Sequence, residues 1–326
     1  MTTATFPIHE GSYDMSAIDR NATKLIFNAN FNQYIHKHEL PPSLKSLVLS
    51  DNFNCGIELG ALPEGLEEIN FGRRYSQHIT KGLLPSTLKR LTLFGQFDGE
   101  IEQGSLPEGL EEIDFGPTYG KKIAKGLLPS TLKKLAMTSD CVDEGSIPEN
   151  VEEVIIIMAT CTLLDLSLFP KGLKILRIMI SLPDNFHDRN LPEGLEELEL
   201  GMVSMDQPLA PGFLPSTLKK LILPYEYNEQ IGPGLLPEGL ESIQLTEWYK
   251  GTVEHIPLTT RIYSVNKQIK DRNYTYVREN KGKDKIASKR RSKRYLIGEG
   301  YSYQTFDVSG TAYDVTFLPK KKGNRS

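Results

Sequence analysis

Three groups of residues in this 326-residue sequence are of types used in catalysis or metal binding, but their spacing does not suit those roles. His36 and His38 are a close histidine pair, yet no Cys-x-x-Cys motif and no carboxylate cluster lies nearby, so we expect surface histidines and no metal site. Residues 297–303 (IGEGYSY) superficially resemble a kinase glycine-rich loop. The third glycine position is Tyr303, and too few residues follow for the other parts of a kinase site.

A third group consists of adjacent carboxylates such as Glu67 and Glu68, or Glu111 and Glu112. A general acid/base pair needs two carboxylates at one unique place, whereas these pairs recur on every second copy of a repeat. No G-x-S-x-G motif and no Cys/His nucleophile arrangement occurs. The sequence therefore predicts that the protein is not an enzyme, with no catalytic residue, no cofactor and no metal ion.

A repeat of about 22 residues carries these groups, and its core is L-P-x-x-L-[K/E]-x-L-x-L. Its proline recurs at Pro41, Pro63, Pro85, Pro107, Pro129, Pro148, Pro170, Pro192, Pro215, Pro237 and Pro257. With one degenerate copy before the first proline, about twelve units span residues 18–265. We expect a leucine-rich-repeat-like solenoid, with one parallel β-strand per coil and irregular or short helical return segments.

Each coil has apolar positions with distinct predicted roles. The alternation of Leu91 and Leu93 predicts a strand with these side chains inward. Phe97 and Ile101, four and eight residues further on, should fill the far side of the coil. A glycine two residues before most Leu-Pro pairs, such as Gly82, should supply turn freedom.

Charge alternates from one coil to the next at the start of each predicted strand. The residues are Glu67 and Glu68, Lys89 and Arg90, Glu111 and Glu112, Lys133 and Lys134, Glu152 and Glu153, Lys171 or Lys174, Glu196 and Glu197, Lys219 and Lys220, and Glu241. Equivalent residues face each other in a parallel stack, where opposite charges attract and like charges repel. We therefore predict a structural charge ladder that helps to set the register.

The second position of each charged pair should point onto the concave face, which is normally the binding surface of a solenoid. Because the ladder satisfies much of that face, a selective contact should come from the more variable row beside it. The candidates in this row are Asn70, Thr92, Asp114, Arg177, Glu199 and Gln244. The irregular stretch around residues 138–190 is the alternative, although its apolar run, residues 154–158 (VIIIM), should be buried core.

The segments LPPSLKSLVL, LPSTLKRLTL and LPSTLKKLIL resemble FNIP repeats, as do the linking segments FNQYI, FNCGI and YNEQI. The resemblance spans about residues 18–265, and it implies protein binding without catalytic residues. Such repeats occur in social amoebae and in giant DNA viruses of amoebae. Several members of the family carry an N-terminal F-box, and we expect none here because about 17 residues precede the first unit.

The charge is unevenly distributed along the chain. Residues 261–326 hold 17 basic and 6 acidic residues, against 21 and 36 in residues 1–260. The run KGKDKIASKRRSKR, residues 281–294, contains the candidate basic patch of Lys289, Arg290, Arg291, Lys293 and Arg294. It has four interpretations: a solvated loop, a nuclear-import signal, a nucleic-acid patch that binds phosphates, or a segment that docks onto the acidic body. Alternating stretches around Ser309 and Gly310 predict a β-hairpin.

We therefore expect a lead-in (1–17), a solenoid (18–265) and a basic appendage (266–326). No run of 18 apolar residues and no signal peptide is present, and three cysteines are an odd number, which favours reduced thiols in the cytoplasm. That compartment would be the host cytoplasm if the protein is viral, and the nucleus is the alternative. The predicted function is a non-catalytic protein–protein interaction scaffold. The second interpretation is a nuclear or nucleic-acid-associated factor acting through residues 281–294.

Overall fold

The structure is a computed structural model of the whole chain. It describes residues 3–5, 14–93, 95, 97–138, 142–157, 166–179, 191–201, 208–224, 226–246, 249–264, 274–276, 303–306 and 312–315. The chain divides into two units, Met1–Ser288 and Lys289–Ser326. Each unit is described separately below.

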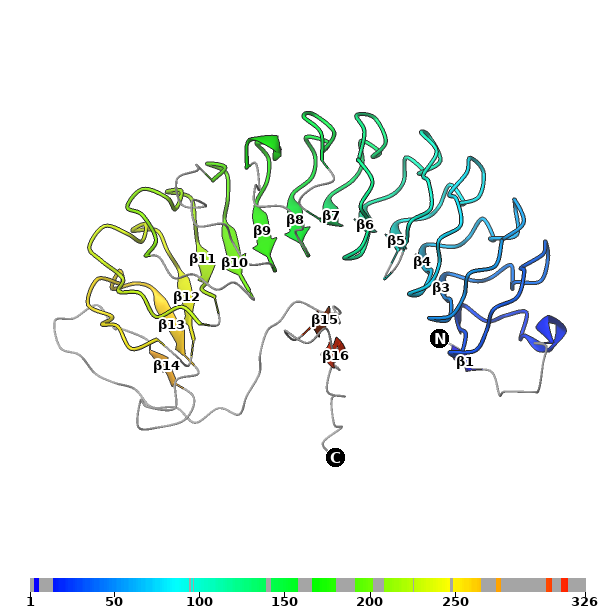
Figure 1. Ribbon diagram of the computed structural model, residues 1–326, viewed down its shortest axis with the longest axis horizontal. Helices are drawn as coiled ribbons and strands as arrows, with labels where there is room; N and C mark the ends of the chain where they lie inside the picture. Colours follow the sequence, from blue (N-terminus) through cyan, green and yellow to red (C-terminus); the bar gives the residue numbers. More distant parts are fainter. Residues whose placement is uncertain are drawn as a thin grey trace. The chain divides into compact units, whose positions relative to one another are not determined.

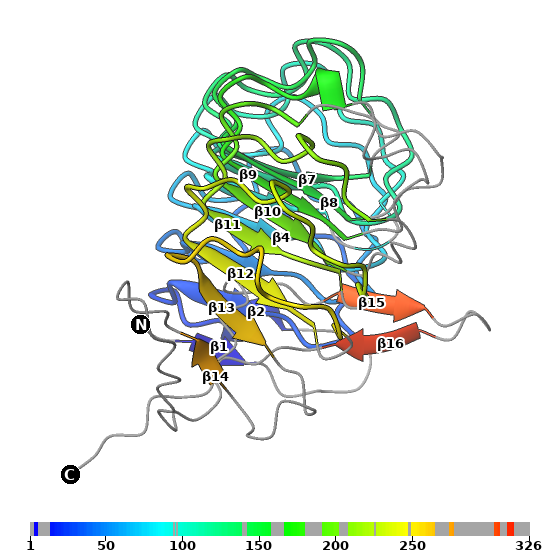
Figure 2. The ribbon, with the colours of Figure 1, turned by 90° about the vertical axis from the view of Figure 1, so that its left-hand side faces the viewer.

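A single sheet organises the first unit, and within the described residues it has fourteen strands whose order follows the sequence. The strands are β1 (Thr3–Thr5), β2 (Lys24–Ile26), β3 (Ser46–Val48), β4 (Glu68–Asn70), β5 (Arg90–Thr92), β6 (Glu112–Asp114), β7 (Lys134–Met137), β8 (Glu153–Ile156), β9 (Ile175–Ile178), β10 (Glu197–Leu200), β11 (Lys220–Ile222), β12 (Ser242–Leu245), β13 (Arg261–Ser264) and β14 (Tyr274–Tyr276). All neighbours are parallel except β13 and β14, which are antiparallel. In this unit the strands line the inner side of a curved stack of coils (Figure 1), and β11, β12 and β13 point the same way (Figure 2).

One short strand per repeat, from β2 to β13, confirms the predicted leucine-rich-repeat-like solenoid. The return segments are irregular, and among the described residues helix is limited to two turns of 3₁₀ helix, η1 (Met15–Ala17) and η3 (Leu166–Leu168). A parallel strand pair needs a long connection back to its start, and the remaining residues of each coil provide it.

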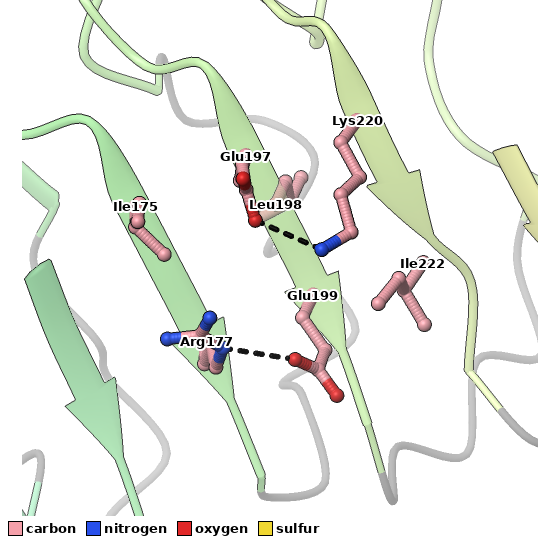
Figure 3. Close-up of a pocket in the computed structure, with 7 residues that line it drawn as sticks. All are labelled: Ile175, Arg177, Glu197, Leu198, Glu199, Lys220 and Ile222. Atoms are coloured by element: carbon pink, nitrogen blue, oxygen red, sulfur yellow. Dashed lines mark hydrogen bonds and ion pairs between the residues drawn. The ribbon is translucent and has the colours of Figure 1, made fainter. Parts of the chain in front are cut away.

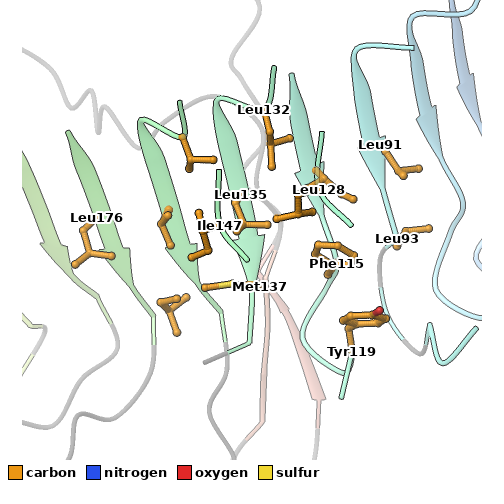
Figure 4. Close-up of a cluster of buried hydrophobic side chains, with 14 of the residues drawn as sticks. Leu91, Leu93, Phe115, Tyr119, Leu128, Leu132, Leu135, Met137, Ile147 and Leu176 are labelled. Atoms are coloured by element: carbon orange, nitrogen blue, oxygen red, sulfur yellow. The ribbon is translucent and has the colours of Figure 1, made fainter. Parts of the chain in front are cut away.

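The interior is one continuous apolar core that runs through successive coils (Figure 4). Leu91 and Leu93, the inward residues of one coil, are 1% and 0% exposed, as the alternation predicts. Most of the apolar run at β8 is also buried, because Val154, Ile155 and Ile156 are fully enclosed, whereas Ile157 is half-buried. A coil of this size cannot bury its own apolar face, so the neighbouring coils supply the burial.

Aromatic side chains form a second ladder on the far side of the coils. The rings of Phe31, Phe53, Tyr75, Phe97 and Tyr119 stack in sequence, with centroids 5.7, 5.8, 6.2 and 5.8 Å apart and planes within 20° of parallel. All five are buried. This arrangement confirms that the aromatic position of the repeat fills the far side of the coil.

Two backbone features explain the Gly-x-Leu-Pro or Gly-x-Ile-Pro sequence found at seven of the corners. The seven glycines of these corners all have φ between 71° and 82°, in the left-handed region that favours glycine. Proline then begins a tight turn, in which its carbonyl accepts a hydrogen bond from the residue three further on. Leu88 N–H donates to Pro85 O at 3.1 Å, and Leu110 N–H donates to Pro107 O at 3.0 Å. Each corner therefore returns the chain to the start of the next strand.

The second unit contains an antiparallel strand pair, β15 (Tyr303–Phe306) and β16 (Ala312–Val315). Tyr303 lies opposite Val315, and Phe306 lies opposite Ala312. The basic run at residues 281–294 lies outside the described residues, as does the glycine-containing segment at residues 297–302. The expected boundary between solenoid and appendage, at residue 265, stays a prediction.

Candidate functional site

Three rows of side chains run across the strand side of the first unit, and we name them by position. The ladder row is the first residue of each strand, the flanking row is the residue before it, and the contact row is two residues after the ladder row. Strand pairing places equivalent residues opposite each other throughout, for example Glu68 opposite Arg90 and Arg90 opposite Glu112. The ladder row and the contact row lie on the outward side of the strands because the residue between them is buried.

The alternating charges pair from coil to coil, which confirms the predicted ladder. In the ladder row, Glu68 pairs with Arg90, Lys134 Nζ lies 3.2 Å from Glu153 Oε1, and Lys220 Nζ lies 3.0 Å from Glu197 Oε2. In the flanking row the ion pairs are Lys45–Glu67 (3.2 Å), Lys89–Glu67 (3.8 Å), Lys133–Glu111 (3.1 Å), Lys174–Glu152 (3.0 Å) and Lys219–Glu196 (2.7 Å). The sequence left open whether Lys171 or Lys174 takes part on this coil, and Lys174 is the one that pairs, in the flanking row.

The β9 coil has no charged residue in the ladder row, and a diagonal ion pair from the contact row compensates for it. The ladder-row residue of β9 is Ile175, which lies between Glu153 and Glu197. Arg177, two residues on in the contact row, pairs with Glu153 and also places Nε 3.0 Å from Glu199 Oε2. The alternation would place a basic residue where Ile175 stands. Arg177, in the contact row, takes over the pairing that such a residue would make with Glu153.

The alternation extends to positions that the charge pattern did not identify. On the basic coils that contain P-S-T, the threonine bridges two carbonyls of the preceding coil, as Thr87 Oγ1 does to Glu64 O (2.5 Å) and Leu66 O (2.8 Å). On the acidic coils that contain P-E-G the same position is glycine, and a Cβ at Gly109 would lie 3.1 Å from Ser86 O. The exceptions are Asn150 on the acidic β8 coil and Gly172 on the β9 coil. The sequence signal was the P-E-G and P-S-T alternation itself, which shows that the structural unit is a pair of coils.

A row of asparagines on the return segments was not predicted from the sequence. Asn32 Oδ1 accepts the Asn54 N–H at 2.8 Å, and Asn54 Oδ1 accepts the Ser76 N–H at 3.0 Å. Asn228 Oδ1 accepts the Lys250 N–H at 2.8 Å. This asparagine follows the aromatic residue of the repeat, so it satisfies a backbone donor in the next coil.

The six predicted contact residues lie in the contact row, but most of them have structural partners. Asn70 Oδ1 accepts the Gly72 N–H at 2.9 Å, and Asp114 Oδ1 accepts the Gly116 N–H at 2.8 Å, so both close a turn at the end of a strand. Arg177 and Glu199 pair with each other. Thr92 is half-buried and Gln244 is exposed. Of the six predicted contact residues, Thr92 and Gln244 are therefore the two whose side chains neither close a turn nor form an ion pair with the described residues.

Asp114 has an unusual environment for a carboxylate. Burial raises the pKa of this carboxyl to about 6, although the Gly116 N–H and the charge of Lys134 act in the opposite direction. Burial also lowers the pKa of Lys134, while Glu112 opposes that shift. The local polar groups therefore hold Asp114 in place but do not offset its loss of hydration.

A shallow depression on β9, β10 and β11 is lined by Ile175, Arg177, Glu197, Leu198, Glu199, Lys220 and Ile222. Figure 3 shows the Arg177–Glu199 and Lys220–Glu197 pairs side by side there, flanked by the two outward isoleucines. The charges compensate each other, so the depression offers mixed apolar and neutralised polar contacts and no group poised for catalysis.

The two histidines, His36 and His38, have different environments. His36 Nδ1 lies 3.7 Å from Glu58 Oε2, and the His36 ring contacts Tyr34, whereas His38 has a positive φ of 68°. Among the residues that the structure describes, no group of three or more His, Cys, Asp or Glu side chains is arranged to hold a metal ion. The described residues also include no helix with the length and apolar character needed to cross a membrane.

The fold and the repeat-by-repeat contacts define a leucine-rich-repeat-type β-solenoid. A comparison with solved structures agrees: the structure of CroV588, described as a novel circular LRR protein from a giant virus, matches with a TM-score of 0.60 at 22% sequence identity. The match covers 80% of this chain and 43% of that one, so this chain spans less than half the length of its neighbour. No curated protein matches the sequence.

The family model of the FNIP repeat matches six times, at residues 21–52, 31–72, 53–95, 97–140, 183–226 and 205–247. These matches together cover more than half of the chain. The chain therefore belongs to the FNIP repeat family, as the resemblance of its motifs implied.

Proposed function

We propose that this protein is a non-catalytic scaffold that binds protein partners through the strand side of its solenoid. The observation that carries the proposal is the contact row, because its side chains project outward from a rigid sheet and vary from coil to coil. Thr92, Gln244 and Tyr263 show that variation, and Gln244 and Tyr263 are exposed. A ladder row that is mostly paired supplies a neutral frame, whereas the variable row beside it supplies specificity.

Partner capture with matched surface variants tests this proposal. The full-length chain is compared with Thr92→Arg and Gln244→Arg on the strand side and with Gln103→Arg, an exposed return-segment position. Proteins captured from native lysate are quantified by mass spectrometry. A partner that both strand-side variants lose and Gln103→Arg keeps is the expected result. A partner set that is the same for all three variants would place the binding surface elsewhere.

The basic run supports a second candidate function, in which the protein associates with nucleic acid or enters the nucleus. Residues 281–294 hold eight basic residues and one acidic residue, enough to contact several phosphates. The test is binding to a random DNA duplex at increasing salt. Affinity that falls with salt, and is lost when Lys289, Arg290, Arg291, Lys293 and Arg294 are changed to Gln, is expected. Affinity that is independent of these five residues would overturn it.

A further inference from the structure

The ladder row contains a neutral position that lies between two basic residues and that no acidic side chain of the described residues fills. Ser242, on β12, lies opposite Lys220 on β11 and opposite Arg261 on β13. Of the four acidic coils preceding it, three read P-E-G-L-E-E and the β8 coil reads P-E-N-V-E-E, but this coil reads P-E-G-L-E-S. Among the described strands, this is the place where two basic ladder residues flank a position without an acid between them.

The contrast with Ile175 shows that the gap at Ser242 is distinct. At Ile175 the two flanking acids are satisfied, because Glu153 pairs with Lys134 and Arg177 and Glu197 pairs with Lys220. At Ser242 the exposed Arg261 has no ion pair with the described residues, and the Ser242 hydroxyl has no hydrogen bond to them. Arg261 is therefore an unpaired cation among the described residues on the strand side of β13.

The spacing around Ser242 suits a carboxylate. Neighbouring strands lie about 4.8 Å apart, so an acid above Ser242 would lie within reach of both basic side chains. The same bridging geometry exists elsewhere in the protein, where Glu67 contacts Lys45 at 3.2 Å and Lys89 at 3.8 Å. The ladder therefore already uses a carboxylate between two cations as a stable arrangement.

The contact row adds polar and aromatic groups beside the gap. Gln244 lies opposite Tyr263, and both side chains are exposed, with Tyr263 at 42%. An amide and a tyrosine next to two cations form a surface for an acidic peptide segment, because the amide and the phenol donate hydrogen bonds and the ring provides apolar area.

We propose that Lys220, Ser242, Arg261, Gln244 and Tyr263 form a docking site for an acidic segment of a protein partner. A glutamate or aspartate of that segment occupies the vacant acidic position of the ladder row, between Lys220 and Arg261. The interaction continues the alternation of the ladder across a molecular interface. This inference rests on the proposed scaffold function and gives it a location and a partner chemistry.

The test uses full-length protein in which Lys289, Arg290, Arg291, Lys293 and Arg294 are changed to Gln, so that the basic run does not bind the probe. The probe is a fluorescein-labelled hexaglutamate peptide, and binding is followed by anisotropy at low ionic strength. In this background we compare Ser242→Glu, Ser242→Ala and Arg261→Gln. Gln103→Glu serves as a control because it changes the net charge of the chain by the same amount as Ser242→Glu.

Ser242→Glu and Arg261→Gln are expected to weaken binding by about fivefold or more, because each removes the favourable contact of the probe with a cation pair. Ser242→Ala and Gln103→Glu should bind within about twofold of the parent. Hexaglutamate that does not bind the parent at low salt overturns the proposal. Equal weakening by Ser242→Glu and Gln103→Glu also overturns it, since this would indicate repulsion by net charge.

Partner capture with the same variants distinguishes failure of the docking-site proposal from failure of the scaffold proposal. A captured partner that is lost on Ser242→Glu and kept on Gln103→Glu supports both. A partner that survives Ser242→Glu and Arg261→Gln contradicts the docking site and leaves the scaffold function standing. Capture of no partner by a parent that binds hexaglutamate leaves the site standing and contradicts the scaffold.

Discussion

The coils of β4–β8 and those of β9–β13 use the same repeat differently. From β4 to β8 the ladder row alternates without interruption from Glu68 to Glu153. From β9 to β13 it reads Ile175, Glu197, Lys220, Ser242 and Arg261, with two neutral positions. In the earlier coils each ladder charge therefore lies beside a residue of opposite charge, whereas in the later coils Arg261 lies beside a neutral residue.

The difference shows how exceptions become informative in a repeat protein. A rule that holds on many coils has a structural cause, here the attraction of opposite charges at strand spacing. A departure from the rule weakens that stabilisation, and departures of this kind are expected at functional sites. Ile175 is repaired internally by Arg177, but Ser242 is not, which is why we place the docking site at β11–β13.

A substitution in the aromatic ladder should cause the largest single loss of stability. Phe53 is fully buried and stacks on both Phe31 and Tyr75. We expect Phe53→Ala to lower the free energy of unfolding by about 4 kcal/mol, measured by urea denaturation. Tyr227→Ala, an equally buried position for which no stacked ring is described, should cost about 1 kcal/mol less. Equal losses would show that burial alone, without stacking, stabilises the earlier coils.

Alanine substitutions at two glycines with similar φ distinguish the cost of backbone strain from the cost of a steric clash. Gly72 has φ of 75°, and an added Cβ would overlap the carbonyl of Ser50. Gly212 has φ of 81°, and nothing lies within 4 Å of an added Cβ. Gly72→Ala should therefore cost about 3 kcal/mol and Gly212→Ala about 1 kcal/mol in thermal or urea unfolding. A Gly212→Ala loss as large as that of Gly72→Ala would contradict this explanation.

Charge reversal tests the ladder itself. Changing Lys133 and Lys134 to Glu would put three acidic coils in a row, and we expect a loss of about 2 kcal/mol at low salt that shrinks as salt is added. Changing Lys219 and Lys220 to Glu should cost less, because Ser242 replaces one of the acidic neighbours. Unchanged unfolding midpoints for both variants at low salt would mean that the alternation does not stabilise the stack.

The smallest expected effect concerns Asp114 and depends on pH. Its pKa is raised from 3.8 to about 6, so the folded state holds the proton more tightly, and this contribution to stability is lost as the pH rises from about 4 to 6. Asp114→Asn keeps the acceptor for Gly116 N–H and should raise the free energy of unfolding by about 1 kcal/mol at pH 7 and by little at pH 4. Asn70→Asp, at the equivalent position, should show the opposite trend. Flat pH profiles for the difference between variant and parent would refute the assignment.

The repeat made most of the fold predictable. Spacing and alternation identified the inward leucines, the buried aromatic position and the glycine turns, because each position meets the same neighbours on every coil. The candidate binding residues were less predictable. Asn70 and Asp114 are polar and variable, as a binding residue would be, but both close turns through the backbone N–H two residues on. Sequence variability does not distinguish an exposed contact from a local cap.

The sequence by itself determined the solenoid, the register of its charges and the family, because a repeated pattern specifies the neighbour of each residue as well as the residue. The tertiary structure alone decided which outward groups are already paired. Arg177 reaches diagonally to Glu153, and Arg261 has no such partner among the described residues. Such pairing depends on side-chain length and direction across neighbouring strands, and these are properties of the folded stack.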